Sequence, residues 1–111
     1  MAALSPSLLK EITTRLVQEF LPEEIILFGS HAWGAPDADS DVDLCVIVSD
    51  SDEKPTRRAA RAYKSLRGLN APVDILVKTR AEFDRLRPVH ASLEGEMMER
   101  GKRLYGRVLK A

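Results

Sequence analysis

The chain has 111 residues, 44% of them hydrophobic and 31% charged, a composition typical of a single soluble globular domain. No stretch reaches the roughly 20 apolar residues of a membrane-spanning helix, and the N-terminus lacks the basic and then apolar pattern of a secretory signal. We therefore expect a cytoplasmic protein with one domain over residues 1–111. Its one cysteine, Cys45, excludes an internal disulfide and a zinc site made of several cysteines.

The formal net charge of zero conceals a division along the chain. Residues 1–53 contain 11 acidic and 2 basic side chains, whereas residues 54–111 contain 15 basic and 6 acidic ones. Seven of the acids lie between Gly34 and Glu53, a segment without Lys or Arg. Each single charge is most simply explained by solvation. A cluster of this density repels itself unless cations neutralise it, so we expect cations there.

The first predicted elements are a helix and a strand. Ser5 is suited to cap a helix that starts at Pro6 and stops before Pro22. The short apolar run 24–28 predicts a buried strand that ends at Gly29. The helix would pack on the sheet through one apolar stripe, formed by Leu8, Leu9, Ile12, Leu16, Val17 and Phe20.

A turn, a loop and a second strand follow. Gly29 and Ser30 open a turn or a short helix, and residues 34–40 have the composition of a loop. Residues 41–48 (DVDLCVIV) predict the second strand, with Cys45 as a small core residue.

Helices and one more strand complete the prediction. Residues 55–66 indicate a helix that ends near Gly68, and residues 72–78 indicate a third strand. Thr79 and Glu82 form a capping box for a helix that ends at Pro88. We expect Ala59, Ala60, Tyr63 and Leu66 to face inward from the 55–66 helix. A last helix, weakened by Gly95 and Gly101, is indicated by Val89, Leu93, Met97 and Leu104. This order of elements predicts a mixed α/β or α+β sandwich.

Three aspartates are the candidate catalytic residues. Asp41 and Asp43 lie two apart on the second strand, so their carboxylates point to the same face, about 7 Å apart. Like charges side by side destabilise a sheet, but they are suited to binding magnesium, which takes carboxylate and phosphate oxygens. Asp74 is a single acid in the otherwise apolar third strand. If that strand lies beside the second, three carboxylates converge; taken alone, each acid could simply be exposed to solvent.

The pair Gly29–Ser30 favours the functional interpretation. A glycine between a buried strand and a helix lets backbone N–H groups face an anion, and a serine hydroxyl can donate to a phosphate oxygen. A lone Gly-Ser pair is usually an ordinary turn. Here it precedes the two aspartates of residues 41–43 by about ten residues, which places a candidate phosphate site near candidate metal ligands.

These residues resemble a known family. The runs 29–34 (GSHAWG) and 40–44 (SDVDL) are similar to the G-S-x-A-x-G and S-D-x-D-L signature of the DNA polymerase β-like nucleotidyltransferase superfamily, with the spacing of its minimal, MNT-type members. Asp74 lies where the family has its third carboxylate, and residues 99–105 resemble the family's C-terminal ending. The resemblance implies the nucleotidyltransferase fold, an α+β sandwich with a small mixed sheet and flanking helices. One departure is that His31 and Trp33 replace residues that are often basic in relatives.

The resemblance also implies a mechanism. Asp41, Asp43 and Asp74 would be both the metal ligands and the catalytic residues, holding two magnesium ions. Gly29 and Ser30 would bind the β- and γ-phosphates of ATP. Asp74 would complete one metal site and could accept the proton of the acceptor. Catalysis would consist mainly of positioning and of neutralising charge in the in-line transition state.

Family analogy suggests a protein acceptor. Short MNT-type proteins commonly act with a HEPN ribonuclease toxin and silence it by transferring AMP from ATP to one of its tyrosines. This predicts an antitoxin in a hetero-oligomer, without membrane or direct nucleic-acid partners. Three alternatives remain: a module that blocks a toxin without catalysis, a subunit of a small-molecule nucleotidyltransferase of the antibiotic-modifying kind, and a structural metal or calcium site.

Overall fold

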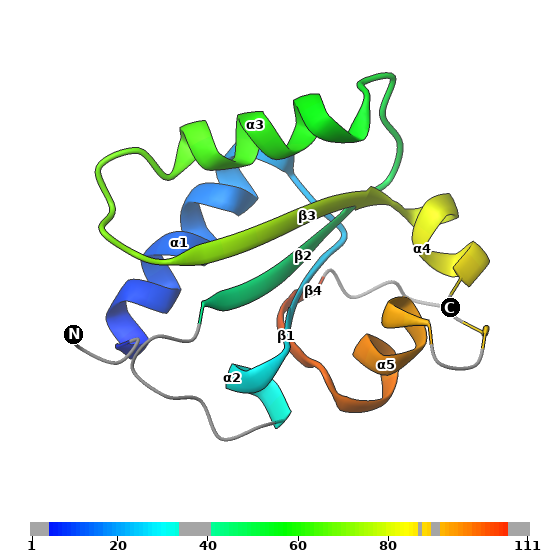
Figure 1. The fold of residues 1–111 in the computed structure, drawn as a ribbon. Coiled ribbons are helices and arrows are strands. Elements are labelled where there is room, and N and C mark those ends of the chain that lie inside the picture. The colour runs from blue at the N-terminus through cyan, green and yellow to red at the C-terminus, as the bar shows by residue number, and fades with distance from the viewer. Residues whose placement is uncertain (1–4, 34–40, 87, 90–91, 107–111) are drawn as a thin grey trace.

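The computed structural model of the chain describes residues 5–33, 41–86, 88–89 and 92–106. Over these residues the chain forms one four-stranded sheet with helices on both faces, which confirms the expected α+β fold class (Figure 1). The loop expected at residues 34–40 lies outside the described residues. In chain order the elements are α1 (Pro6–Phe20), β1 (Glu24–Phe28), α2 (Ser30–Trp33), β2 (Val42–Val48), α3 (Pro55–Ser65), β3 (Val73–Thr79), α4 (Arg80–Leu86), α5 (Leu93–Arg100) and β4 (Lys102–Gly106).

Local sequence signals explain where several helices begin. The Ser5 hydroxyl accepts the N–H of Leu8 at 3.1 Å and caps α1, as expected. At the start of α4, the N–H of Glu82 donates to the Thr79 hydroxyl at 3.1 Å, and the Thr79 N–H donates to the Glu82 carboxylate at 3.0 Å. This reciprocal pair is the predicted capping box, and it satisfies two N–H groups that the first turn leaves without helical partners.

The strands lie in the order β3-β2-β1-β4. Strand β1 is antiparallel to both β2 and β4, whereas β2 and β3 are parallel. The parallel pair is joined through α3, which crosses over one face of the sheet (Figure 1). As a result, β2 and β3 begin at the same end of the sheet.

Two apolar cores lie on opposite faces of the sheet. Helices α1 and α3 cover the first face, and α4 and α5 contribute to the second (Figure 1). Alternate residues of β2 divide between the two faces. The first core is formed by Ile12, Leu16, Ile25, Leu27, Val42, Leu44, Val46, Val48, Ala62, Leu66, Ile75 and Val77. The second is formed by Ile26, Phe28, Cys45, Ile47, Phe83 and Met97, which confirms Cys45 as a buried core residue.

The C-terminal part of the described chain differs from the prediction. Instead of one helix that includes Leu104, the chain forms α5 and then β4, with Gly101 between them. A Cβ at Gly101 would lie 2.5 Å from Met97 O and 2.7 Å from Ile26 Cγ2, so the chain passes too close to β1 for a larger residue. Strand β4 pairs with the edge of β1 that β2 leaves free. This long-range pairing outweighs the helical spacing of the apolar residues.

The predicted inward face of α3 was also partly wrong. Ala60 and Tyr63 are exposed, whereas Arg58 and Ala62 are buried together with Leu66. Arg58 is only 4% exposed because its guanidinium donates two hydrogen bonds to Glu82, at 2.8 and 2.9 Å. A partner from α4, distant in sequence, therefore allows a charged residue to occupy the inner face of the helix. No described helix is long and apolar enough to cross a membrane.

Candidate active site

Asp43 and Asp74 lie side by side on neighbouring strands. They are Cα partners in the parallel register of β2 and β3, where adjacent strands are about 4.8 Å apart. The sequence left open whether these two strands are neighbours; they are, and the register brings Asp43 and Asp74 together without an offset. Asp41 immediately precedes β2 and is exposed, as is Asp74, whereas Asp43 is half-buried.

Asp43 and Asp74 lie on the second face of the sheet, in a part where the side chains of β3 are more exposed than those of the second core. Because side chains alternate along a strand, Asp43 projects to the same face as Cys45 and Ile47, which belong to the second core. Further along β3 on this face, Leu76 is 37% exposed and Lys78 forms an ion pair with Glu94 of α5 at 3.0 Å. Helix α5 thus reaches the Lys78 end of β3, whereas Asp74, near the other end of this strand, is exposed.

Gly29 supports Asp43 from the end of β1. Phe28 is the Cα partner of Asp43, so Gly29, the next residue, lies close to the Asp43 carboxylate. Gly29 has a φ of +78°, a conformation that favours glycine, and a Cβ at this position would overlap Oδ2 of Asp43. Both the backbone angle and the lack of space therefore require glycine here. Ser30 follows as the first residue of α2, which packs beside β1 and β2.

The ionisation of Asp43 reflects crowding of negative charge. Burial raises the pKa of this carboxyl above its ordinary value of 3.8, and the charges of Asp74 and Asp41 raise this pKa further. His31 on α2 has the opposite effect and lowers the pKa of Asp43. Asp74 and Asp41 therefore both interact electrostatically with Asp43, and His31, which departs from the family pattern, lies close enough to influence Asp43.

The donor set fits a hard divalent cation that shares its coordination with a substrate. Among the described residues, no three His, Cys, Asp or Glu side chains are grouped so that they could enclose a metal ion. Magnesium does not need such a group, because it is usually bound by one or two carboxylates together with waters and substrate phosphates. A cation between Asp43 and Asp74 would offset the repulsion that raises the pKa of Asp43.

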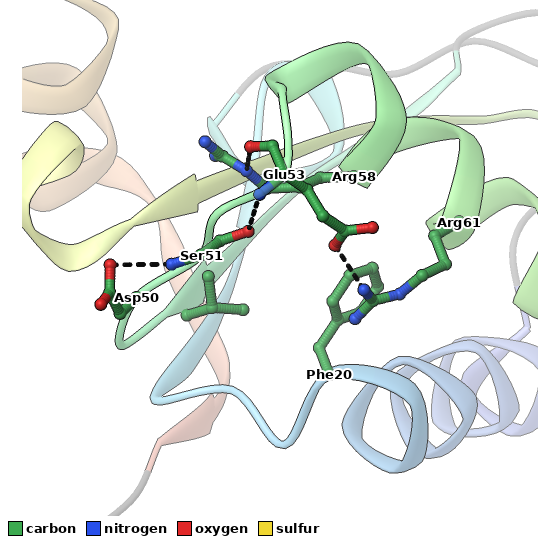
Figure 2. A pocket seen from close by; sticks show the side chains of 7 residues that line it. Phe20, Asp50, Ser51, Glu53, Arg58 and Arg61 are labelled. Carbon is green, nitrogen blue, oxygen red and sulfur yellow. Dashed lines mark hydrogen bonds and ion pairs between the residues drawn. The ribbon is translucent and has the colours of Figure 1, made fainter.

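A polar hollow of about 120 Å³ is lined by Asp50, Glu53 and Arg58 among others (Figure 2). It lies at the Val48 end of β2, whereas Asp43 is near the opposite end of that strand. Its cationic side chains already have partners. Arg61 forms ion pairs with Glu53 and Glu19 and lies 4.6 Å above the ring of Phe20, and the buried Arg58 donates to Glu82. These contacts tie α3 to the end of α1 and to α4. We therefore assign the two arginines of the hollow a structural role, which is to connect the helices, and not a catalytic one.

Sequence reasoning assigned Tyr63 to the core and missed its position at the edge of the sheet. The side chain is 44% exposed, and its hydroxyl accepts a hydrogen bond from the N–H of Ile75 at 3.0 Å. Ile75 directly follows Asp74. No local signal in the sequence could indicate this contact, because it depends on how α3 crosses β3.

Comparisons with solved structures agree with this architecture. A candidate nucleotidyltransferase from Sulfolobus solfataricus is 24% identical, with a TM-score of 0.65, over 91% of this chain and 79% of that chain; at this identity, the likeness concerns the fold. A toxin–antitoxin structure with AMP-PNP is 26% identical, with a TM-score of 0.61, over 88% of this chain and 73% of that chain. No curated protein matches the chain.

The family comparison covers most of the chain. The family model named nucleotidyltransferase domain matches residues 9–102, which extend from α1 to the start of β4. This region includes the Gly29 turn and the neighbouring aspartates at positions 43 and 74. The chain belongs to the nucleotidyltransferase domain family.

Proposed function

We propose that this protein is a magnesium-dependent nucleotidyltransferase that transfers AMP from ATP to a tyrosine of a HEPN-type toxin, and that it thereby acts as an antitoxin. Membership of the nucleotidyltransferase family implies a nucleotide substrate. One structural neighbour is a toxin–antitoxin structure with AMP-PNP, an analogue of ATP, which favours a toxin partner and an adenine nucleotide. The observation that carries the proposal is the register of Asp43 beside Asp74, next to the turn at Gly29.

In the proposed site the residues have separate tasks. Asp41 and Asp43 would hold two magnesium ions, with Asp74 completing one of the two metal sites. Bound magnesium neutralises charge on the transferring phosphate and on the leaving pyrophosphate. Gly29 and Ser30 would position the β- and γ-phosphates, and the open part of the second face would admit the acceptor.

The transfer itself is an in-line displacement. The phenolic oxygen of the toxin tyrosine forms a bond to the α-phosphorus of ATP, and the bond from that phosphorus to the oxygen bridging the α- and β-phosphates breaks. Pyrophosphate leaves with the electron pair of the broken bond. Asp74 accepts the phenolic proton, and the product is a phosphodiester between tyrosine and AMP.

The proposal is tested by incubating the purified protein with the toxin, magnesium and ATP labelled at either the α- or the γ-phosphate. We expect the toxin to acquire the α label and no γ label. Asp43→Asn should reduce labelling by at least about a hundredfold, the scale expected for loss of electrostatic stabilisation of a transition state. Asp52→Asn is the matched control, because Asp52 is an exposed acid beyond the end of β2 that is far from the Gly29 turn.

Two outcomes would contradict the proposal in different ways. If the toxin were neutralised without acquiring label, the protein would be a binding module rather than an enzyme. If AMP were transferred to an aminoglycoside or a similar small molecule and not to the toxin, the small-molecule alternative would replace it. Removal of the acceptor tyrosine from the toxin by a Phe substitution should abolish labelling and leave binding of the two proteins intact.

A further inference from the structure

Strand β3 is at the edge of the sheet, and its outer side is covered by side chains. The Ile75 N–H donates to the Tyr63 hydroxyl at 3.0 Å, and the Val77 carbonyl accepts from Arg58 Nη1 at 2.9 Å. The Thr79 N–H donates to Glu82, also at 3.0 Å. These backbone groups face away from β2, where an edge strand usually presents unpaired N–H and C=O groups. Side chains from α3 and α4 thus form hydrogen bonds with the outward-facing backbone of β3 at three alternate residues, 75, 77 and 79.

The three contacts differ in their distance from the aspartates. Arg58 and Glu82 act at the C-terminal end of β3, where α4 begins. Tyr63 acts near the N-terminal end, one residue after Asp74, which is the Cα partner of Asp43. Of these three edge contacts, that of Tyr63 is nearest to the paired carboxylates.

Packing in the two apolar cores does not account for the position of Tyr63. Its side chain is 44% exposed and does not belong to either apolar core. The hydroxyl, in contrast, has a defined partner in the backbone of Ile75. A phenylalanine at this position would keep the ring and remove the acceptor, which leaves the Ile75 N–H to solvent and frees the strand beside Asp74.

We propose that Tyr63 is a positioning residue for Asp74. Its hydroxyl fixes β3 directly after Asp74 and so maintains the separation of the Asp74 and Asp43 carboxylates that a shared magnesium ion requires. Because this inference rests on the proposed function, it needs measurements that do not depend on transfer to a toxin. Tyr63 itself does not contact the reacting atoms.

The test compares Tyr63→Phe with the unmodified protein in three measurements. The first is amide hydrogen exchange at Ile75, followed by NMR without metal. The second is the dissociation constant of magnesium in the presence of AMP-PNP, and the third is kcat and KM for AMP transfer. A neutral hydrogen bond corresponds to about a fivefold effect, so we expect Ile75 to exchange about fivefold faster and magnesium to bind about fivefold more weakly. We expect kcat to fall by about fivefold, with the KM for ATP unchanged because the turn at Gly29 is intact.

Tyr105→Phe is the matched control, because Tyr105 lies on β4 at the opposite edge of the sheet. It should leave all three quantities unchanged. The inference is overturned if Ile75 exchange is the same in Tyr63→Phe, or if exchange accelerates while magnesium affinity and kcat are unaltered. In the second case the hydroxyl would only cover the sheet edge. Absence of transfer by the unmodified protein would overturn the proposed function, and the exchange and magnesium measurements would still decide the role of Tyr63.

Discussion

The carboxylate of Asp43 occupies the space that a side chain at Gly29 would need. A Cβ built on Gly29 would overlap Oδ2 and lie 3.1 Å from Cγ of Asp43. Gly29 directly follows β1 and Asp43 lies on the antiparallel neighbour β2, so the close approach follows from the pairing of Phe28 with Asp43. The turn that would position phosphates and the carboxylate that would bind metal are therefore immediate neighbours, so a larger residue at position 29 would displace the carboxylate.

Substitution of Gly29 by alanine should affect activity and stability together. We expect Gly29→Ala to reduce the free energy of unfolding by about 1–3 kcal/mol, because alanine is strained at this positive φ and its methyl group displaces Asp43. Nucleotide transfer should fall by at least about a hundredfold, as expected when a catalytic group is displaced by about 1 Å. Urea unfolding and the transfer assay measure the two effects.

Gly68→Ala provides the control for backbone strain. Gly68 has a φ of +92° and no atom within 4 Å of a built Cβ, so this variant has the strain without the collision. It should lose stability but keep its transfer activity. Equal loss of activity in the two variants would contradict the explanation based on Asp43.

Removal of the charge at Asp43 should stabilise the metal-free protein. Burial and the charges of Asp74 and Asp41 raise the pKa of Asp43, so folding favours the protonated form and is opposed by the ionised one. The benefit of protonation is complete below the ordinary value of 3.8 and is lost as pH rises through the folded pKa. At pH 7, Asp43→Asn should therefore melt about 2–4 °C higher than the unmodified protein, although it is inactive.

Melting temperatures measured over a range of pH test whether ionised Asp43 destabilises the folded protein. The difference in melting temperature should shrink as pH falls through the folded pKa of Asp43 and should close below 3.8, where the carboxyl is protonated. Magnesium should raise the melting temperature of the unmodified protein more than that of the variant. A variant that is less stable at pH 7 without metal would show that the carboxylate has a favourable structural role.

The sequence predicted those parts of the fold that have local signals. The strand at residues 24–28 lies between Pro22 and Gly29, and its bounds are confirmed. The capping box of Thr79 and Glu82 is confirmed as well. Such signals are sufficient because the interactions that they describe occur within one turn or between adjacent residues.

Features that depend on distant partners were less predictable. The segment that contains Leu104 has the spacing of a helix, but it pairs with β1 as a strand. Arg58 is buried because Glu82 from another helix neutralises it. Three aspartates were identified from the residue pattern, whereas the register of Asp43 with Asp74 and the edge contact of Tyr63 required the three-dimensional structure. Neither strand order nor register is encoded in a local pattern.

Gly101→Ala should destabilise the junction of α5 and β4. The added methyl group would lie 2.5 Å from the Met97 carbonyl oxygen and 2.7 Å from Ile26 Cγ2, and both neighbours are held in place. We expect a loss of about 1–3 kcal/mol in urea unfolding, typical of overpacking. At Gly106 a methyl group would meet the flexible side chain of Arg103, so Gly106→Ala should be close to neutral. Equal losses in the two variants would contradict this account.

Cys45 should be unreactive in the folded protein. The thiol is fully buried, and burial raises its pKa to about 12. Because the thiolate is the reactive form, alkylation by iodoacetamide at pH 8 should be about a thousandfold slower than for an exposed cysteine. Guanidinium at a concentration that unfolds the protein should restore the ordinary rate. Rapid modification of the native protein would show that the second core opens readily.

Stability in acid should depend on the pair formed by Arg58 and Glu82. The hydrogen bonds from Arg58 lower the pKa of Glu82 from 4.5 to about 2, despite the opposing effect of burial. A lowered folded pKa stabilises the protein above the ordinary value, and this contribution disappears as pH falls through the folded value. Glu82→Gln should therefore reduce the free energy of unfolding by about 2 kcal/mol at pH 7, a figure discounted because Glu82 is 32% exposed.

The pH profile distinguishes this ion pair from a packing effect. The difference between Glu82→Gln and the unmodified protein should be constant above about pH 5 and should close between pH 4.5 and 2, as Glu82 becomes protonated. Urea unfolding at several pH values measures it. Glu99→Gln is the control, because Glu99 is exposed at the end of α5, and it should be neutral throughout. A deficit in Glu82→Gln that persists at pH 2 would indicate that the loss arises from the shape of the side chain rather than from its charge.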